Sequence, residues 1–230
     1  MTEWMENSVF FGVFLTLFSY AVGMMIQKKW KLAVFNPLLI SIILSISVIL
    51  IFGIDYEKYS EGTEYLSYLM TPATICLAIP LYEKLDLLKK NYKAIMIGIT
   101  SGVLTSLCSV LLLAYLFRFD HSIFVTMLPK SITTAIGIGI SEELGGYVSL
   151  TASVIIMTGL LGNMTAQGIC KLFKITEPVA RGVAIGTSAH AMGTAKAMEM
   201  GETEGAVSSL AIVTAGILTV IGASIFAQLM

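Results

Sequence analysis

The chain has 230 residues, of which 56% are apolar and 13% are charged, and its formal net charge is −1. An average soluble domain carries roughly 25% charged residues, so a water-soluble fold of this length would lack the polar surface to cover itself. The charges stand in short runs between long apolar stretches, as in the loops of membrane proteins. This pattern excludes a nucleic-acid-binding face and predicts an all-α integral membrane protein with the lipid bilayer as its surroundings.

Long apolar stretches give the first prediction of membrane helices. Crossing the hydrocarbon core takes about 20 helical residues. Five stretches meet this length without interruption: Ser8 to Ile26, Leu32 to Ile54, Ala94 to Phe117, Tyr147 to Ile169 and Gly205 to Leu229. The segment Met1 to Asn7 has no basic residue, so we expect the first helix to be retained rather than cleaved as a signal peptide.

Three further stretches are apolar but interrupted, which brings the expected total to about seven or eight membrane segments. They are Tyr65 to Tyr82, Ser122 to Ile140 and Pro178 to Met198. Lys and Arg are retained in cytoplasmic loops, so their positions predict the orientation. The basic residues fall in three loops, which we assign to the cytoplasm: Lys28, Lys29 and Lys31; Lys84, Lys89, Lys90 and Lys93; Lys171, Lys174 and Arg181.

The remaining loops are acidic or nearly neutral and are predicted to lie outside. They are Asp55 to Glu64, Arg118 to His121, Ser141 to Gly146 and Glu199 to Glu204. Both ends of the middle interrupted segment then fall on the outer side, which predicts a re-entrant hairpin, an external N-terminus and a cytoplasmic C-terminus. In the alternative, the segment crosses and Lys171, Lys174 and Arg181 lie outside.

A weak internal repeat supports a transporter-like architecture for a single domain of residues 1–230. Thr71 to Thr74 and Thr187 to His190 are both polar breaks followed by a charged loop and a long apolar helix. With the hairpin in place, the expected repeats 1–118 and 119–230 run in opposite directions. Inverted repeats with broken helices are the construction of many secondary transporters.

The first two interrupted segments contain candidate substrate-binding residues, because irregular backbone inside a membrane survives only where it is buried in protein or lines a wet cavity. In the first segment these are Thr71, Pro72 and Thr74, although a simple proline kink is the alternative. In the middle segment they are Lys130, Ser131, Thr133 and Thr134. A lysine cation beside a helix start suits an anion. In the alternative, Lys130 extends to the outer interface.

The third interrupted segment is the densest in polar residues. Its candidate binding residues are Thr187, Ser188, His190, Gly193, Thr194 and Lys196. His190 is the expected proton-coupling residue, because its ordinary pKa of about 6.5 lets it change charge near neutral pH. A hydrogen-bonded packing role is the alternative for His190. Lys196 and Glu199 are placed to form a charge pair, and Gly186 and Gly193 to admit another backbone closely.

No constellation typical of an enzyme accompanies these residues, so we expect neither catalysis, nor a cofactor, nor a metal site. The chain has two histidines, no nucleophile elbow, no phosphate-binding glycine loop and no pair of carboxylates in an apolar stretch. Active transport would therefore draw on an ion or substrate gradient.

These motifs resemble the LrgB/CidB family. The resemblance rests on Thr71-Pro72-Ala73-Thr74 with Ala78 to Tyr82, on Leu128 to Thr134, and on Ala189 to Ala195 with Glu199 to Glu202 and Gly205-Ala206. Ala135 stands where we expect a proline. The resemblance implies a bacterial plasma-membrane protein connected with murein hydrolase activity and autolysis, with a small LrgA/CidA-like membrane partner. Among relatives it also implies transport of glycolate, glycerate or pyruvate.

The expected function is therefore secondary transport of small monocarboxylates of the pyruvate, glycolate, glycerate or lactate type, since basic, hydroxyl-lined breaks suit a carboxylate. The alternative is a non-transporting, antiholin-like regulator that assembles with the LrgA/CidA-like partner. A homo-oligomer is a further expected assembly.

Overall fold

The computed structural model describes residues 10–30, 32 and 35–230, and in these ranges it contains helices and no strands. The predicted all-helical class is thus confirmed. Met1 to Asn7, the start of the first span at Ser8, and Lys31 lie outside the described residues. The chain divides into two compact units, residues 1–76 and 77–230, which are considered separately.

Five helical runs in the described part of the chain are long and apolar enough to cross a membrane. They are Phe11–Trp30, Tyr56–Glu83, Tyr92–Phe117, Val148–Leu172 and Glu202–Leu229. The predicted stretch Leu32 to Ile54 forms a shorter apolar helix, Pro37–Phe52. The chain is therefore a multi-pass membrane protein. The larger number of seven or eight segments stays a prediction.

The N-terminal unit contains α2 (Phe11–Trp30), α3 (Pro37–Phe52), α4 (Tyr56–Tyr68) and α5 (Met70–Cys76). Helices α2 and α3 pack through small residues: a Cβ added to Gly23 would lie 2.7 Å from the Pro37 carbonyl oxygen. The stretch Asp55 to Glu64, predicted as an outer loop, is helical from Tyr56 with Asp55 as its cap, and its side of the membrane stays a prediction. Asp55 Oδ1 accepts the Glu57 backbone N–H at 2.8 Å, which satisfies one free donor of the first turn.

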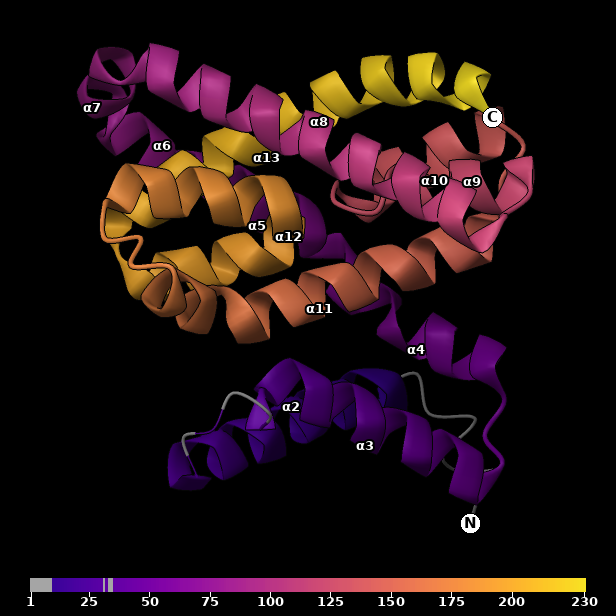
Figure 1. Ribbon diagram of the computed structural model, residues 1–230. Helices are drawn as coiled ribbons and strands as arrows, with labels where there is room; N and C mark the ends of the chain where they lie inside the picture. Colours follow the sequence, from indigo (N-terminus) through magenta and orange to yellow (C-terminus); the bar gives the residue numbers. More distant parts are fainter. Residues whose placement is uncertain (1–9, 31, 33–34) are drawn as a thin grey trace. The chain divides into compact units, whose positions relative to one another are not determined.

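The C-terminal unit consists of three long unbroken helices, a fourth long helix that is interrupted, and several short helices. The unbroken long helices are α8 (Tyr92–Phe117), α11 (Val148–Leu172) and α13 (Glu202–Phe226), which continues into η2 (Ala227–Leu229). The short helices α6 (Ala78–Glu83) and α7 (Leu85–Lys90) precede α8, and α9 (His121–Met127) and α10 (Thr134–Glu143) follow it. Figure 1 shows α8 and α11 running in opposite directions along the unit.

The core of the C-terminal unit lies between α8, α9 and α13. Helix α8 buries residues at spacings of three and four, including Ile95, Ile99, Val103 and Leu107, as expected of one helix face. Phe124 of α9 and Val207 of α13 are fully buried against this face. The neighbouring face of α8 carries Ser and Thr, and it contributes to the groove described below.

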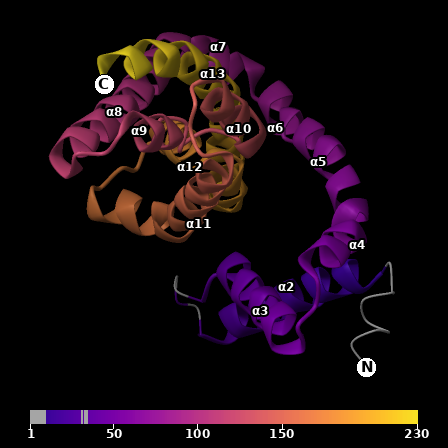
Figure 2. The ribbon, with the colours of Figure 1, turned by 90° about the vertical axis from the view of Figure 1, so that its right-hand side faces the viewer.

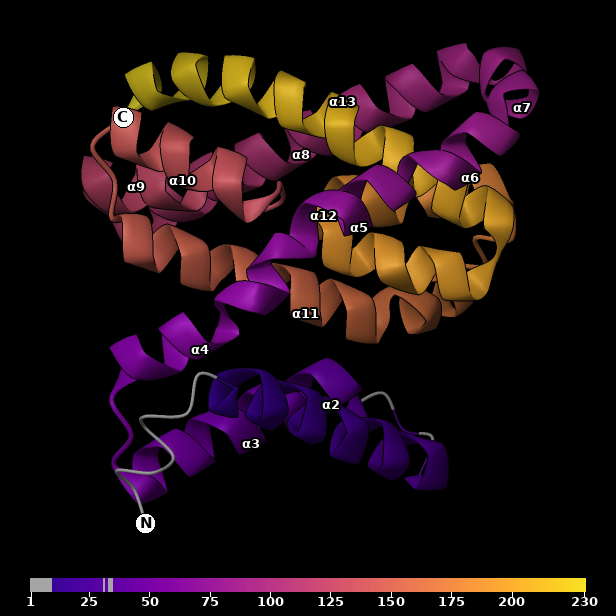
Figure 3. The ribbon, with the colours of Figure 1, turned by 180° about the vertical axis from the view of Figure 1, so that it is seen from behind.

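Helix α12 (Pro178–Met200) folds back on itself, and Figures 1 and 3 show its two arms side by side. The backbone is not helical at Ala189, where φ is −132° and ψ is 17°, or at His190, where φ is 40° and ψ is −138°. Gly193 of the second arm consequently lies against Ile185 of the first, with an added Cβ 3.1 Å from the Ile185 carbonyl oxygen. In a straight helix these two residues would stand about 12 Å apart.

The structure therefore brings together loops of the C-terminal unit that were predicted to lie on opposite sides of the membrane. The segment Pro178 to Met198 was expected to cross, but its reversal brings the loop at Glu199 to Glu204 back beside the basic loops. Lys84 Nζ lies 2.9 Å from Glu202 Oε2, and the pKa of Lys84 is raised by this hydrogen bond and by the negative charge of Glu202. Arg181 Nη1 lies 3.4 Å from Glu204 Oε1.

The C-terminus lies at the other end of the unit. Helix α13 starts beside Lys84 and Arg181 and extends for 25 residues, or about 37 Å. At its far end His121 Nδ1 is hydrogen-bonded to the Met230 carbonyl oxygen at 2.8 Å. The C-terminus and the basic loops, which were predicted to share a side, thus lie at opposite ends of the unit, and the side of the membrane that each end faces stays a prediction. We refer below to the basic end, with Lys84, Arg181 and Glu202, and the carboxyl end, with His121 and Met230.

Candidate functional site

The short helices α9 and α10 are joined by a turn at residues 128–133 that reaches the middle of α8. Ser131 Oγ lies 3.2 Å from Ser106 Oγ, and Ser106 stands 11 residues, or about 16 Å, from the end of α8 at Phe117. The last turn of α10 and the end of α9 nearest the turn meet the start of α11: Thr151 Oγ1 donates to Ser141 Oγ at 2.6 Å and lies 3.3 Å from the Thr126 carbonyl oxygen. The chain therefore enters and leaves this pair at the carboxyl end.

The reversal of α12 reaches a similar level from the basic end. Gly102 of α8 faces Thr187, whose Oγ1 would lie 3.0 Å from a Cβ added to the glycine. Gly102 stands about 15 Å from the start of α8 at Tyr92. Gly102 and Ser106 are one helical turn apart, so the two tips meet neighbouring turns of α8. Figure 2 shows the short helices between α8, α11 and α13.

A groove of about 770 Å³ lies between α8 and the first arm of α12. Its walls are small or hydroxyl-bearing residues of the two helices, and Lys130 and Ser131 line it as well. On α8 the hydroxyl-bearing wall residues are Ser101, Thr105, Ser106 and Ser109, and on α12 they are Thr187 and Ser188. Asn91 and Glu177, which directly precede α8 and α12, also line it, so the groove extends to the basic end.

Lys130 is the one cation among the residues that line this groove. Its Nζ donates to Ser131 Oγ at 3.0 Å, and Ser131 is in turn within hydrogen-bond distance of Ser106. Within the described ranges, Lys84, Arg181 and Lys196 each have a carboxylate within 4 Å, whereas Lys130 has none. Two of the three N–H donors of an ammonium group therefore remain for a ligand or for water.

His190 does not line the groove. It is 4% exposed, and its Nε2 lies 3.0 Å from the Ile155 carbonyl oxygen of α11. A carbonyl only accepts hydrogen bonds, so Nε2 must hold the proton in this arrangement. If His190 is a packing residue, the Ile155 carbonyl is its hydrogen-bond partner. Its proton-coupling role stays a prediction.

The remaining candidates of the third interrupted segment support the reversal. Thr194 Oγ1 donates to the His190 carbonyl oxygen at 3.0 Å and lies 2.6 Å from Ser208 Oγ of α13. Gly193 allows the second arm to approach Ile185, and Gly186 faces the Ser208 carbonyl oxygen, so both predicted close approaches are confirmed. The predicted pair of Lys196 and Glu199 is also confirmed, at 2.7 Å. Lys196 belongs to the returning arm and does not line the groove.

The other predicted site residues are not brought into the groove. Thr133 directly precedes α10 and makes no side-chain capping bond, and Thr134 is the first residue of α10. Thr71, Pro72 and Thr74 lie in α5 of the N-terminal unit, where Thr74 Oγ1 donates to the Met70 carbonyl oxygen at 2.8 Å. Their participation in a site stays a prediction.

Sequence reasoning missed the α11 residues that hold the tip of α12. Asn163 Nδ2 donates to the Met192 carbonyl oxygen at 2.7 Å. A Cβ added to Gly159 would lie 2.5 Å from His190 Nε2, and one added to Gly162 would collide with Ala189 Cβ. The available signal was Asn163 itself, because an amide within a long apolar stretch is uncommon unless it has a partner. The spacing of Ser101, Thr105 and Ser109 likewise indicated a hydroxyl-bearing face on α8.

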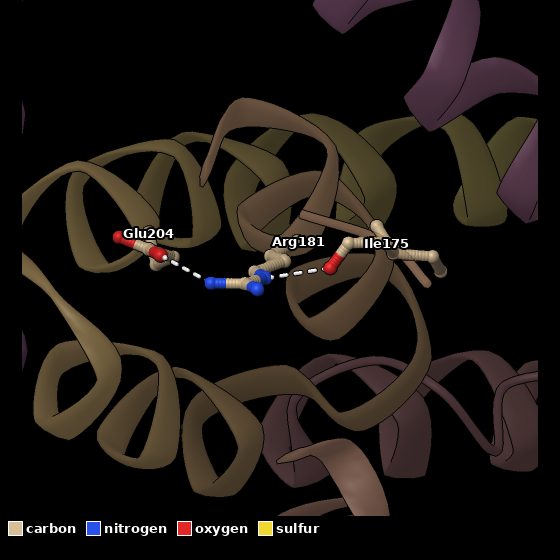
Figure 4. A network of polar contacts seen from close by, with 3 residues as sticks. All are labelled: Ile175, Arg181 and Glu204. Carbon is tan, nitrogen blue, oxygen red and sulfur yellow. Dashed lines mark hydrogen bonds and ion pairs between the residues drawn. The ribbon is translucent and has the colours of Figure 1, made fainter. Parts of the chain in front are cut away.

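An ion-paired cluster joins the start of α12 to the start of α13 at the basic end (Figure 4). Arg181 Nε donates to the Ile175 carbonyl oxygen at 2.8 Å, and Nη1 lies 3.4 Å from Glu204 Oε1. Glu204 is 5% exposed, so Arg181 supplies the charge partner that a buried carboxylate requires. This cluster fixes the α11 to α12 connection beside the groove.

Comparison with known proteins places these features in a family. A sequence profile of the LrgB-like family matches residues 16–229. The chain is also 37% identical over 223 residues to the antiholin-like protein LrgB of Bacillus subtilis (strain 168), covering 96% of each chain. No solved structure matches the chain. A match over nearly the full length confirms the resemblance drawn from the motifs, and the chain belongs to the LrgB-like family.

Proposed function

We propose that this chain is a secondary transporter or facilitator of small monocarboxylates in the bacterial plasma membrane. The observation that carries the proposal is Lys130, a cation with no carboxylate partner in the described chain, in a hydroxyl-lined groove. Cations within membrane segments are costly and usually face a partner or a wet cavity. A carboxylate of the pyruvate, lactate, glycolate or glycerate type would supply the missing charge.

The groove suits a small anion in size and chemistry. Its volume of about 770 Å³ is within the roughly 300 to 1,000 Å³ of ligand pockets, which leaves room for a three-carbon acid with water. Lys130 offers two free donors, and the Ser131 and Ser106 hydroxyls stand beside it. Thr187 and Ser188 provide further oxygen atoms on the opposite wall.

The arrangement of the two broken segments suits alternating access. We propose that α9 and α10 form a re-entrant hairpin from the carboxyl end and that α12 forms a second one from the basic end. Each follows a long helix, so the inverted repeat would comprise residues 92–143 and 148–200 rather than 1–118 and 119–230. Sites near the midplane between opposed, broken helices are characteristic of secondary transporters.

We further propose that the basic end faces the cytoplasm, since Lys and Arg are retained there. The groove then opens inward and the C-terminus lies outside. Single cysteines at Thr203 and Gly145 distinguish the two ends: an impermeant thiol reagent applied to intact cells should label Gly145→Cys and spare Thr203→Cys until the cells are permeabilised. Labelling of both positions in intact cells would contradict the reversal of α12.

The alternative is an antiholin-like function, as the name of the Bacillus relative indicates for that protein. In that alternative the chain regulates autolysis without transport, by assembling with an LrgA/CidA-like membrane protein. Transport could itself influence autolysis through metabolism or the proton gradient, so an autolysis phenotype does not separate the two.

Uptake into proteoliposomes that contain only this chain tests the proposal. Saturable uptake of labelled pyruvate, lactate or glycolate, reduced by the unlabelled acid and absent from empty liposomes, is the expected result. If the purified, folded chain takes up none of these acids while it binds an LrgA/CidA-like protein tightly, the regulatory alternative is correct.

A further inference from the structure

Lys130 differs from Lys84, Arg181 and Lys196 in that no carboxylate among the described residues lies within 4 Å of its ammonium group. In the part of the chain that the structure describes, its hydrogen-bond partner is Ser131 Oγ at 3.0 Å, and the next group is Ser106 Oγ, 3.2 Å from Ser131. Leu128 and Ile132, in the same turn, are 1% and 2% exposed. Lys84, Arg181 and Lys196, by contrast, each lie within 4 Å of a carboxylate.

The titratable groups around Lys130 are few. Of the α8 residues that line the groove, none is ionisable, and of the α12 residues and their cap only Glu177 is. Glu177 precedes the first turn of α12 and stands 11 residues, or about 16 Å, from Ser188 at the inner end. Glu142 and Glu143 close α10 at the carboxyl end. The α11 residues Thr151 and Ile155, which lie against α9 and α10, carry no charge. Glu202 and Glu204 of α13 pair with Lys84 and Arg181.

An ammonium group in such surroundings is stabilised by an arriving anion and destabilised when the anion leaves. A charge removed from water without a partner tends to neutralise, and lysine does so readily because it can lose its proton. Binding of a carboxylate at Lys130 and protonation of Lys130 therefore favour one another. By thermodynamic reciprocity, each must strengthen the other by the same factor.

His190 is less suited to this linkage in the observed arrangement. Its Nε2 donates to the Ile155 carbonyl oxygen, and it does not line the groove. A proton gained by His190 would therefore not be placed against a carboxylate in the groove.

We propose that Lys130 couples proton movement to carboxylate movement, an inference that rests on the proposed transport function. The neutral amine accepts a proton from water in the groove, and the resulting ammonium binds the carboxylate. On the opposite side the carboxylate leaves and the ammonium returns its proton to water. One proton and one monocarboxylate cross together, with no net charge moved.

Proteoliposome transport with paired variants tests this assignment. The wild-type chain should take up the acid faster under an inward proton gradient, acidify a trapped pH dye, and ignore a membrane potential set by potassium and valinomycin. Lys130→Arg keeps a cation that does not deprotonate, so uptake should continue without proton flux and respond to an inside-positive potential. His190→Gln should retain the wild-type coupling.

Retention of proton flux by Lys130→Arg, or its loss in His190→Gln, would overturn the assignment. Absence of uptake by the wild-type chain would instead count against the transport function itself. If Lys130→Arg takes up no acid, calorimetry tests the proposal instead. Binding of the acid to purified protein is measured in buffers of different ionisation enthalpy, which gives the number of protons taken up on binding. The wild type and His190→Gln should each take up about one proton per carboxylate bound. Binding to the wild type without proton uptake would refute the proposal.

Discussion

Lys130 and His190 both lie at the turn of a broken helical segment, but their surroundings differ. The turn that carries Lys130 lines a groove, and its cation meets one hydroxyl. The turn that carries His190 packs on α11. There the Ile155 carbonyl accepts a hydrogen bond from His190, and Asn163 donates one to the Met192 carbonyl. Gly159 and Gly162 leave room for His190 and Ala189. The comparison teaches that a polar residue in a broken membrane helix can serve either a ligand or the break itself. Its partners decide which.

The largest effect should come from removing the groove cation. Lys130→Met leaves a bound carboxylate without a partner, so uptake should fall by about 100-fold or more. Lys196→Met is the matched control, because Lys196 pairs with Glu199 outside the groove, and its uptake should stay within about twofold of wild type. Initial rates at several substrate concentrations measure both. An equal loss of uptake in the two variants would contradict a specific role for Lys130 in binding the carboxylate.

The next effect concerns the seat of the α12 tip. A side chain at Gly162 would collide with Ala189, so Gly162→Val should destabilise the fold by about 3 kcal/mol. Gly168→Val, on the same helix with nothing within 4 Å of its Cβ, makes the same chemical change in open space. Thermal unfolding in detergent should show a lowered midpoint for the first variant and little change for the second. Similar midpoints would contradict the close contact of α11 with the tip.

Some of this architecture could be predicted from the sequence. The long apolar stretches around α8, α11 and α13 were found because length and hydropathy report directly on membrane helices. The middle segment was identified as broken because Pro129 and Lys130 are incompatible with an ordinary apolar span.

The reversal of α12 could not be predicted in the same way. Neither Ala189 nor His190 is a helix-breaking residue, so nothing local marks the turn. Its cause is tertiary: α11 supplies the space at Gly162 and the donor at Asn163, 27 residues earlier in the chain than Ala189 and His190. Hydropathy does not report the direction of a chain, so the sequence did not predict that the C-terminus and the basic loops lie at opposite ends of the unit. The substrate-binding role of Thr71, Pro72 and Thr74 in α5 stays a prediction.

A smaller effect should follow from changing one donor at the tip. Asn163→Asp keeps the shape of the side chain, and its ionised carboxylate has no hydrogen to donate to the Met192 carbonyl oxygen, which should cost about 2 kcal/mol of stability. Gln167→Glu makes the same amide-to-acid change at an exposed position of α11 and should cost less. The difference in unfolding midpoint between the two variants measures the bond. Equal unfolding midpoints would contradict the hydrogen bond between Asn163 and the tip of α12.

The smallest effect tests the backbone of the turn. His190 has a φ of 40°, a conformation that costs a residue with a Cβ about 1 kcal/mol or more and costs glycine little. His190→Ala and His190→Gly both lose the imidazole and its bond to Ile155, so they differ in backbone strain alone. The glycine variant should therefore be more stable than the alanine variant by about 1 kcal/mol.

A helical position in the same segment gives the opposite sign and so serves as the control for this pair. Ala195 is exposed and lies in the second arm of α12, whose dihedral angles are helical beyond His190. There glycine should be less stable than alanine by about 1 kcal/mol, because an unstrained helix favours alanine. Chemical or thermal unfolding of the four proteins, including the wild-type alanine at 195, measures both differences. If alanine is the more stable residue at both positions, His190 does not adopt the left-handed conformation and the chain does not reverse there.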